Sequence, residues 1–171
     1  MTFFLRFRIW LIAGLVALLS VSFVVRVPTA KYIGSGIQTF LPLIAAICSA
    51  GNGTILETVS RYALLEMAVQ GSKLGLGAST MNQRPNGGDG GFPSGHAARA
   101  SFGAAAALRE CAFVLPAART VLVLSAGFTA TSRVSEEKHS IWQVVFGVLY
   151  GIFGDALFRR NWRRRKHVHI D

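Results

Sequence analysis

The sequence predicts an all-α integral membrane protein, a six-helix bundle formed by a single domain of residues 1–171. Hydrophobic residues make up 51% of the 171 residues, whereas charged residues make up only 15%. The mean hydropathy is +0.44, and the apolar residues are concentrated in long stretches with few charges. This composition excludes a disordered chain and a purely soluble basic protein.

The first two predicted helices are uncharged stretches, residues 9–25 and 32–56. At about 1.5 Å of rise per residue, the first stretch is just long enough to cross a hydrocarbon core. Pro28 follows it at a place where a cleavage site needs a small residue, so we expect an uncleaved signal anchor. In the second stretch, Pro42 predicts a kink and the Gly-Asn-Gly sequence at residues 51–53 predicts the exit turn.

The third predicted helix, residues 54–76, carries three charges, on Glu57, Arg61 and Glu66. Arg61 lies four residues after Glu57, so these two side chains can meet on one face of the helix. Charges inside a membrane helix need partners. We therefore expect this face either to turn into the bundle or to lie in the membrane interface.

Three further helices are predicted, at residues 97–115, 120–132 and 140–158. Pro116 follows the first of them and is expected to close it. Six crossings that start from a basic N-terminus return the chain to its starting side, which places both termini in the cytoplasm. The loops at residues 77–96 and 133–139 then emerge together on the opposite face, and we expect the active site there, outside a bacterial inner membrane.

The net charge of +10, from 18 Lys and Arg against 8 Asp and Glu, first suggests a nucleic-acid partner. However, six of these cations lie in the basic tail, residues 159–171, directly after an apolar stretch. That pattern is typical of the cytoplasmic flank of a membrane helix. We therefore expect the bilayer as the partner of this tail, and no nucleic acid.

The two cysteines, Cys48 and Cys111, lie far apart in the sequence among apolar residues. Neither has a Cys or His neighbour at the spacing of a metal site. They are predicted to be small buried hydrophobic residues without a disulfide framework.

The two loops that emerge together hold most of the residues able to carry chemistry. His96 and His139 each lie just before an apolar stretch, and Arg84 and Arg133 lie in or beside the same loops. Guanidinium groups suit phosphate geometry, and the free N–H groups where a helix begins bind anions. One imidazole can then attack phosphorus while the other protonates the leaving oxygen. This chemistry needs no metal and no cofactor, because the cations stabilise the charge.

The polar residues form three sequence parts in order. The parts are Arg84-Pro85, then Pro93-Ser94-Gly95-His96, then Ser132-Arg133 with His139 six residues later. This arrangement, within residues 73–147, resembles the signature of the type 2 phosphatidic acid phosphatase (PAP2) superfamily. The resemblance implies a six-helix membrane fold, with His139 as the nucleophile and His96 as the acid. It also implies that the phosphate-binding residues are Lys73, Arg84, Ser94, Gly95 and Arg133.

The sequence departs from the family pattern at two positions. The family usually has a lysine seven residues before the arginine of the first part; Gly77 stands there, and Lys73 lies eleven residues before Arg84. It also usually has an aspartate four residues after the nucleophilic histidine, where this chain has Gln143. We expect the Gln143 carbonyl to accept a hydrogen bond from the Nδ1–H of His139 and so fix the tautomer.

The resemblance implies metal-independent hydrolysis of a lipid phosphate, or of an isoprenoid or other lipid diphosphate, through a phosphohistidine. Two alternatives remain open. The same site could transfer the phosphoryl group to a second lipid, or the chain could be a non-catalytic membrane protein that binds a lipid phosphate.

Overall fold

The computed structural model describes residues 28–111 and 116–157. Within these ranges it contains helices and no strand, which agrees with the predicted all-α class. The first predicted crossing, residues 9–25, and the basic tail, residues 159–171, lie outside the described residues. The elements are α2 (Pro28–Gly51), α3 (Ile55–Leu76), the 3₁₀ helix η1 (Thr80–Asn82), α4 (Gly95–Glu110), α5 (Pro116–Ser135) and α6 (Ile141–Ala156).

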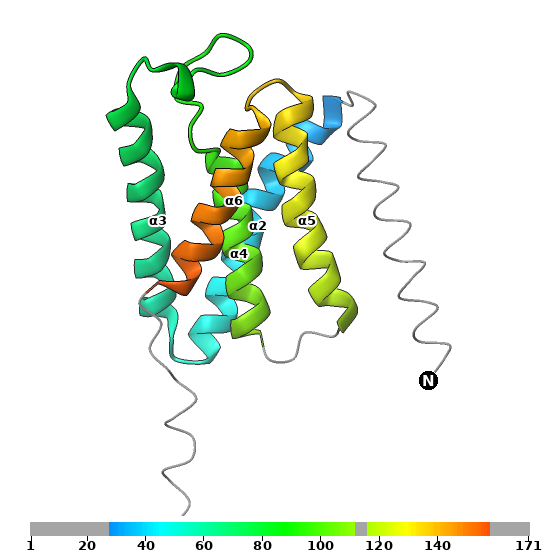
Figure 1. Ribbon diagram of the computed structural model, residues 1–171. Helices are drawn as coiled ribbons and strands as arrows, with labels where there is room; N and C mark the ends of the chain where they lie inside the picture. The colour runs from blue at the N-terminus through cyan, green and yellow to red at the C-terminus, as the bar shows by residue number, and fades with distance from the viewer. Residues whose placement is uncertain (1–27, 112–115, 158–171) are drawn as a thin grey trace, which may run out of the picture.

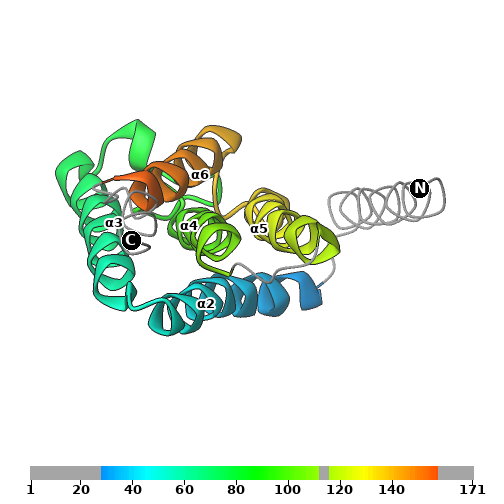
Figure 2. The same cartoon turned by 90° about the horizontal axis from the view of Figure 1, so that it is seen from below.

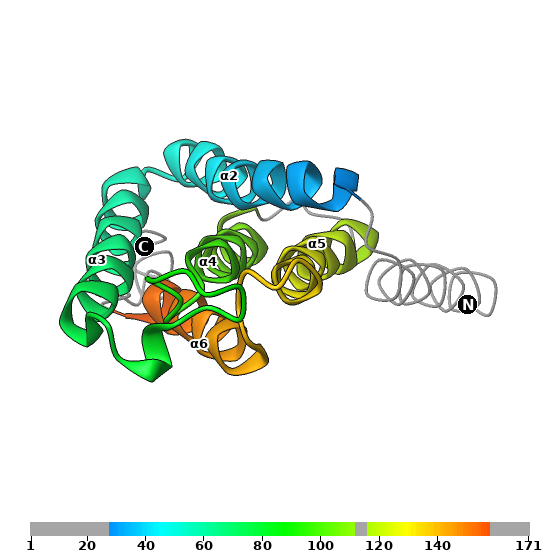
Figure 3. The ribbon, with the colours of Figure 1, turned by 90° about the horizontal axis from the view of Figure 1, so that it is seen from above.

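Helix α4 lies at the centre of the bundle, and α2, α3, α5 and α6 surround it (Figures 2 and 3). Its sequence is rich in alanine and glycine, and most of its side chains are buried. Small side chains let neighbouring helices approach closely on every side. A Cβ atom on Gly103 would clash with the backbone of Pro42 in α2, and one on Gly151 of α6 would clash with the carbonyl oxygen of Ala98.

The predicted helix boundaries need one correction, at Pro116. This proline was expected to end the fourth predicted helix; instead, α4 ends at Glu110 and Pro116 is the first residue of α5. Proline suits the first position of a helix because its missing N–H would have no partner there. Helix α5 consequently begins before the predicted stretch at residues 120–132 and continues to Ser135.

Two of the three charges predicted on α3, those of Arg61 and Glu66, turn into the bundle, which was one of the two expected placements. Arg61 is buried and lies 3.7 Å from a carboxylate oxygen of Glu110 at the end of α4. Glu66 accepts hydrogen bonds of 2.6 and 2.8 Å from the guanidinium of Arg99. Arg61 and Glu66 therefore each meet an opposite charge on α4, and α3 can present apolar residues outward.

A disulfide joins Cys48 and Cys111, with an S–S distance of 2.05 Å. The expectation of two unpaired, buried cysteines was therefore wrong. Cys48 lies in the last turn of α2 and Cys111 directly follows α4. The two helices run in the same direction (Figure 1), so their ends meet although the cysteines lie 63 positions apart in the sequence.

One described helix segment, Tyr32–Gly51, is long and apolar enough to cross a membrane by its length and composition. Large apolar side chains are also exposed on other helices, among them Leu64 and Met67 of α3 and Trp142 and Phe153 of α6.

Candidate functional site

Two connections lie at the same end of the bundle, as the sequence predicted. One runs from α3 to α4 through η1, and the other joins α5 to α6 (Figure 1). They bring together the three sequence parts that hold the candidate residues. The disulfide lies at the opposite end.

His139 is buried in the connection between α5 and α6, with 4% of its surface exposed. Its Nδ1 lies 2.8 Å from the carbonyl oxygen of Gly91. Because a carbonyl oxygen only accepts, Nδ1 carries the proton and Nε2 keeps a lone pair. The pKa of His139 is lowered to about 4, mainly by burial; the hydrogen bond to Gly91 and the nearby side chain of Gln143 oppose this shift, and the cations Arg84 and Lys73 add to it. The ring is therefore a neutral base over the physiological range.

Gln143 does not make the hydrogen bond expected of it. Its Oε1 accepts from the backbone N–H of Ser140 at 3.1 Å, and the Ser140 hydroxyl accepts from the Gln143 N–H in return. Its Nε2 donates to the carbonyl oxygens of Met81 and Gln83, at 3.0 and 2.9 Å. The expected acceptor for Nδ1 was therefore wrong, because the amide of Gln143 caps α6 and binds the neighbouring loop. The Ser-x-x-Gln spacing is that of a capping box, a signal that the sequence already contained.

Ser94 is the N-cap of α4, and its side chain is fully buried. The hydroxyl oxygen has no hydrogen-bond partner among the described residues and caps no backbone N–H. Gly95 and His96 follow in the first turn, where backbone N–H groups point out of the helix end. A buried hydroxyl beside these N–H groups suits an anionic oxygen.

Lys73 reaches the site despite its altered spacing. Its Nζ lies 3.8 Å from the point where a Cβ of Gly95 would stand. Asn82 supports this placement, because its Nδ2 donates to the carbonyl oxygens of Lys73 and Gly77, at 3.0 and 2.7 Å. Lys73 forms no ion pair within the part of the chain that the structure describes.

The two arginines have different surroundings. Arg133 is buried and forms an ion pair of 3.0 Å with Glu136. Arg84 is partly buried; its Nη2 lies 3.4 Å from the carbonyl oxygen of Gly90, and its buried Nε has no hydrogen-bond partner among the described residues. His96 interacts electrostatically with Arg133, Lys73 and His139, which places it within the same cluster. The structure therefore brings together every residue predicted for the site.

A family model for the PAP2 superfamily matches residues 10–166. The chain belongs to the PAP2 superfamily. This membership assigns it to a group of proteins that are generally phosphatases acting on phosphate esters. No curated protein and no solved structure matches the chain.

Two residues of this PAP2 protein escaped the sequence analysis. Gly91 is a glycine in a loop rich in glycines, and nothing in the sequence marks its carbonyl as the partner of an imidazole. Asn82 is 2% exposed and holds the loop together, but a single asparagine in a polar loop gives no signal. Within the described ranges, no group of three His, Cys, Asp or Glu side chains could hold a metal ion.

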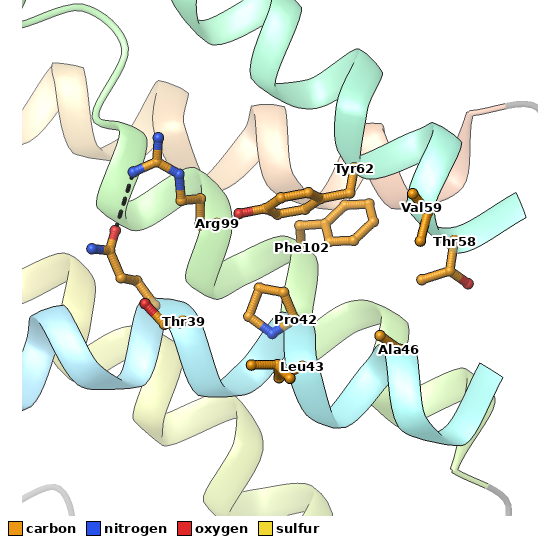
Figure 4. Close-up of a pocket in the computed structure, with 10 residues that line it drawn as sticks. Thr39, Pro42, Leu43, Ala46, Thr58, Val59, Tyr62, Arg99 and Phe102 are labelled. Atoms are coloured by element: carbon orange, nitrogen blue, oxygen red, sulfur yellow. Dashed lines mark hydrogen bonds between the residues drawn. The ribbon is translucent and has the colours of Figure 1, made fainter. Parts of the chain in front are cut away.

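An apolar groove of about 440 Å³ begins beside the site and lies between α2, α3 and α4 (Figure 4). Its polar end is formed by Gln38 and Arg99, and Arg99 lies one helical turn after Gly95. The Nη1 of Arg99 lies 3.7 Å from the point where a Cβ of Gly95 would stand. The remaining lining residues are mostly apolar: Thr39, Pro42, Leu43, Ala46, Thr58, Val59, Tyr62 and Phe102.

Proposed function

We propose that this PAP2 protein hydrolyses a lipid phosphate or diphosphate, without a metal, through a phosphohistidine on His139. The observation that carries this proposal is a pair of buried donors that have no hydrogen-bond partner among the described residues, the Ser94 hydroxyl and the Arg84 Nε, beside a neutral imidazole. Unpaired buried donors are costly unless a ligand pairs with them. A phosphoryl group offers several acceptor oxygens and would satisfy both donors.

In the proposed reaction, Nε2 of His139 attacks phosphorus with its lone pair. A P–N bond forms, the P–O bond to the leaving group breaks, and His96 supplies the proton that the leaving oxygen needs. Burial, and then the nearby cations, lower the pKa of His96 to about 4 in the protein alone, and the negative charge of the bound phosphoryl group would raise it so that the ring holds this proton. Water then attacks phosphorus, His96 takes a proton from that water, and the P–N bond breaks to release phosphate. Each step conserves the proton on Nδ1, which the carbonyl of Gly91 accepts throughout.

The negative charge of the transferring phosphoryl group would be stabilised by Lys73, Arg84 and Arg133. The backbone N–H groups of Gly95 and His96 and the hydroxyl of Ser94 add neutral donors at the start of α4. Three cations supply the charge stabilisation for which other phosphatases use metal ions. This is the reason to propose a metal-independent reaction.

The groove beside Arg99 supports a lipid as the substrate. A phosphoryl group bound at His139 would leave the apolar part of a lipid next to the apolar lining of the groove. The exposed apolar side chains on the outer helix surfaces support a location in the bilayer. We further propose the orientation that the charge pattern indicates, with both termini in the cytoplasm and the active site outside.

The purified full chain in detergent should be assayed with a panel of lipid monophosphates and isoprenoid diphosphates in the presence of excess EDTA. Wild-type protein should release inorganic phosphate, and His139→Ala should release none. If the substrate carries a labelled phosphoryl group and the label is transferred to a second lipid instead of to water, the protein is a phosphotransferase. The proposal is wrong if the wild type turns over no member of the panel, or if EDTA abolishes activity and magnesium or zinc restores it.

A further inference from the structure

The Nδ1 of His139 lies beside the carbonyl oxygen of Gly91, at the position where PAP2 proteins usually have a carboxylate that orients the nucleophilic ring. We propose that the carbonyl of Gly91 orients the nucleophilic imidazole, and that the side-chain amides of Asn82 and Gln143 are positioning residues that aim this carbonyl at His139. The inference rests on the proposed function, because it takes His139 as the nucleophile.

Asn82 holds the opposite side of the same peptide unit. The carbonyl oxygen of Gly91 contacts Nδ1 of His139, and the N–H of Phe92, which belongs to the same planar peptide, donates to Oδ1 of Asn82 at 3.1 Å. The N–H and C=O of a trans peptide point in opposite directions. Fixing the N–H on Asn82 therefore fixes the direction of the carbonyl.

The backbone of Asn82 adds a second attachment. Its carbonyl oxygen accepts the N–H of Gly91 at 2.6 Å, so both N–H groups on either side of the orienting carbonyl end on one residue. The same side chain binds the backbone of Lys73 through Nδ2. Asn82 thus ties the orienting peptide to the end of α3 that carries a phosphate-binding cation.

Gln143 holds the loop from the side of α6. A Cβ atom on Gly91 would stand within 2.5 Å of Nε2 and 2.8 Å of Oε1 of Gln143, so the glycine packs directly on the amide. The two bonds from Nε2 to the carbonyl oxygens of Met81 and Gln83 fix the residues directly before and after Asn82. An amide can make these bonds because it offers two donors as well as an acceptor.

An aspartate at position 143 would not do this work. A carboxylate has no donor for the carbonyl oxygens of Met81 and Gln83, and its charge would be repelled by them. The shorter side chain would also withdraw from the Ser140 N–H. Although the family usually has aspartate here, this chain should therefore lose activity on Gln143→Asp, because the loop that presents Gly91 would be released.

The direct test measures the tautomer of His139 in the full chain, labelled with ¹⁵N-histidine in detergent and studied by long-range ¹H–¹⁵N NMR. The His139 signals are identified by their loss in His139→Ala. In wild-type protein, His139 should be a single tautomer with the proton on Nδ1. In Asn82→Ala and in Gln143→Ala it should become a mixture of tautomers, whereas Asn86→Ala, an exposed site in the same loop, and Gln70→Ala, an exposed site on α3, should leave it unchanged.

The kinetic arm uses the best substrate of the panel. Gln143→Ala should lower kcat by about tenfold to a hundredfold, the size expected when an orienting contact is lost. KM should stay within about threefold, because Lys73, Gly95 and Arg133 lie on helices outside the loop that Gln143 holds. Gln143→Asp should be at least as slow as Gln143→Ala.

The inference is overturned by Gln143→Asp at or above wild-type kcat, or by an unchanged His139 tautomer in both Asn82→Ala and Gln143→Ala. Because the NMR measurement needs no substrate, it decides the inference even if the wild type turns over no lipid phosphate. A lack of turnover with a fixed Nδ1–H tautomer would count against the proposed function alone. Either alanine variant suffices if the other does not fold.

Discussion

The backbone N–H of Ser94 donates a hydrogen bond of 2.9 Å to the carbonyl oxygen of Gln143. This bond joins the start of α4, where His96 lies, to the first turn of α6, which directly follows His139. One turn further along α6, Gly147 packs against Ser94. The separation of the two histidines is therefore set by the contact between α4 and α6.

Gly147→Ala should separate these helices. The new Cβ would stand 2.5 Å from the carbonyl oxygen of Ser94, which is backbone and cannot turn away. We expect a loss of stability of about 1–3 kcal/mol, typical of overpacking, and a fall in kcat of about tenfold or more, because misplaced catalytic groups lose rate steeply. Thermal unfolding in detergent and steady-state kinetics measure the two effects.

Gly127→Ala in α5 is the matched control, because nothing lies within 4 Å of the added Cβ. It should keep wild-type activity and gain up to about 1 kcal/mol from the higher helix propensity of alanine. Equal effects of the two variants would show that the α4–α6 contact does not set the site.

His96→Ala should impair phosphorylation of the enzyme only for substrates whose leaving group needs a proton from an acid. When a lipid phosphate reacts, the lipid alcohol leaves as an alkoxide that needs a proton, so hydrolysis of this substrate should fall by about a hundredfold to ten-thousandfold. A nitrophenyl phosphate, whose leaving group needs no proton, should still phosphorylate the enzyme. The acid-labile phosphoenzyme should be trapped from His96→Ala and be absent from His139→Ala; phosphoenzyme in His139→Ala would exclude His139 as the nucleophile.

Stability should depend on pH through His139. Its pKa is lowered in the folded protein to about 4 from the usual 6.5, mainly by burial, so between these values the unfolded chain binds a proton that the folded chain does not. The folded state should therefore lose up to about 3 kcal/mol as the pH falls from 6.5 to about 4. Thermal unfolding across this window should show a smaller loss in His139→Gln, and parallel curves for the two proteins would contradict the low pKa.

Filling the groove should affect only substrates with long tails. Ala46 lines the groove, so Ala46→Phe should displace several methylene groups of a bound tail, each worth about 0.8 kcal/mol. We expect kcat/KM for a long-chain lipid phosphate to fall by about tenfold or more, with little change for a short-chain ester. Ile47→Phe, at an exposed neighbouring position outside the groove lining, is the control; an equal loss for both substrates in Ala46→Phe would mean that the tail binds elsewhere.

The sequence was sufficient to predict the described helices approximately and the meeting of the two polar loops. Long apolar stretches alternate with polar connections, so counting them predicts which loops share an end. The catalytic candidates His96 and His139 followed from the same count. Lys73 shows the limit of prediction from sequence spacing. Its spacing to Arg84 departs from the family pattern, yet the turn of η1 and the bonds of Asn82 bring the lysine to the site.

The remaining features depend on contacts between distant segments. The partner of His139 is a backbone carbonyl, which every residue has, so no side chain in the sequence could mark Gly91. The pairing of Cys48 with Cys111 depends on α2 and α4 running side by side, which spacing alone does not show. Gln143 was misassigned because its resemblance to the family aspartate was weighed without its place in a capping box.

The Cys48–Cys111 bond also makes the chain a reporter of its own orientation. The bond lies at the end of the bundle that the proposed topology puts in the cytoplasm, where thiols are kept reduced. If the protein has that orientation, the reducing cytoplasm should favour the two thiols over the bond in the living cell. Cells quenched in acid and alkylated before lysis should then yield two modified cysteines, whereas an intact disulfide would mean that the bundle is inserted the other way round.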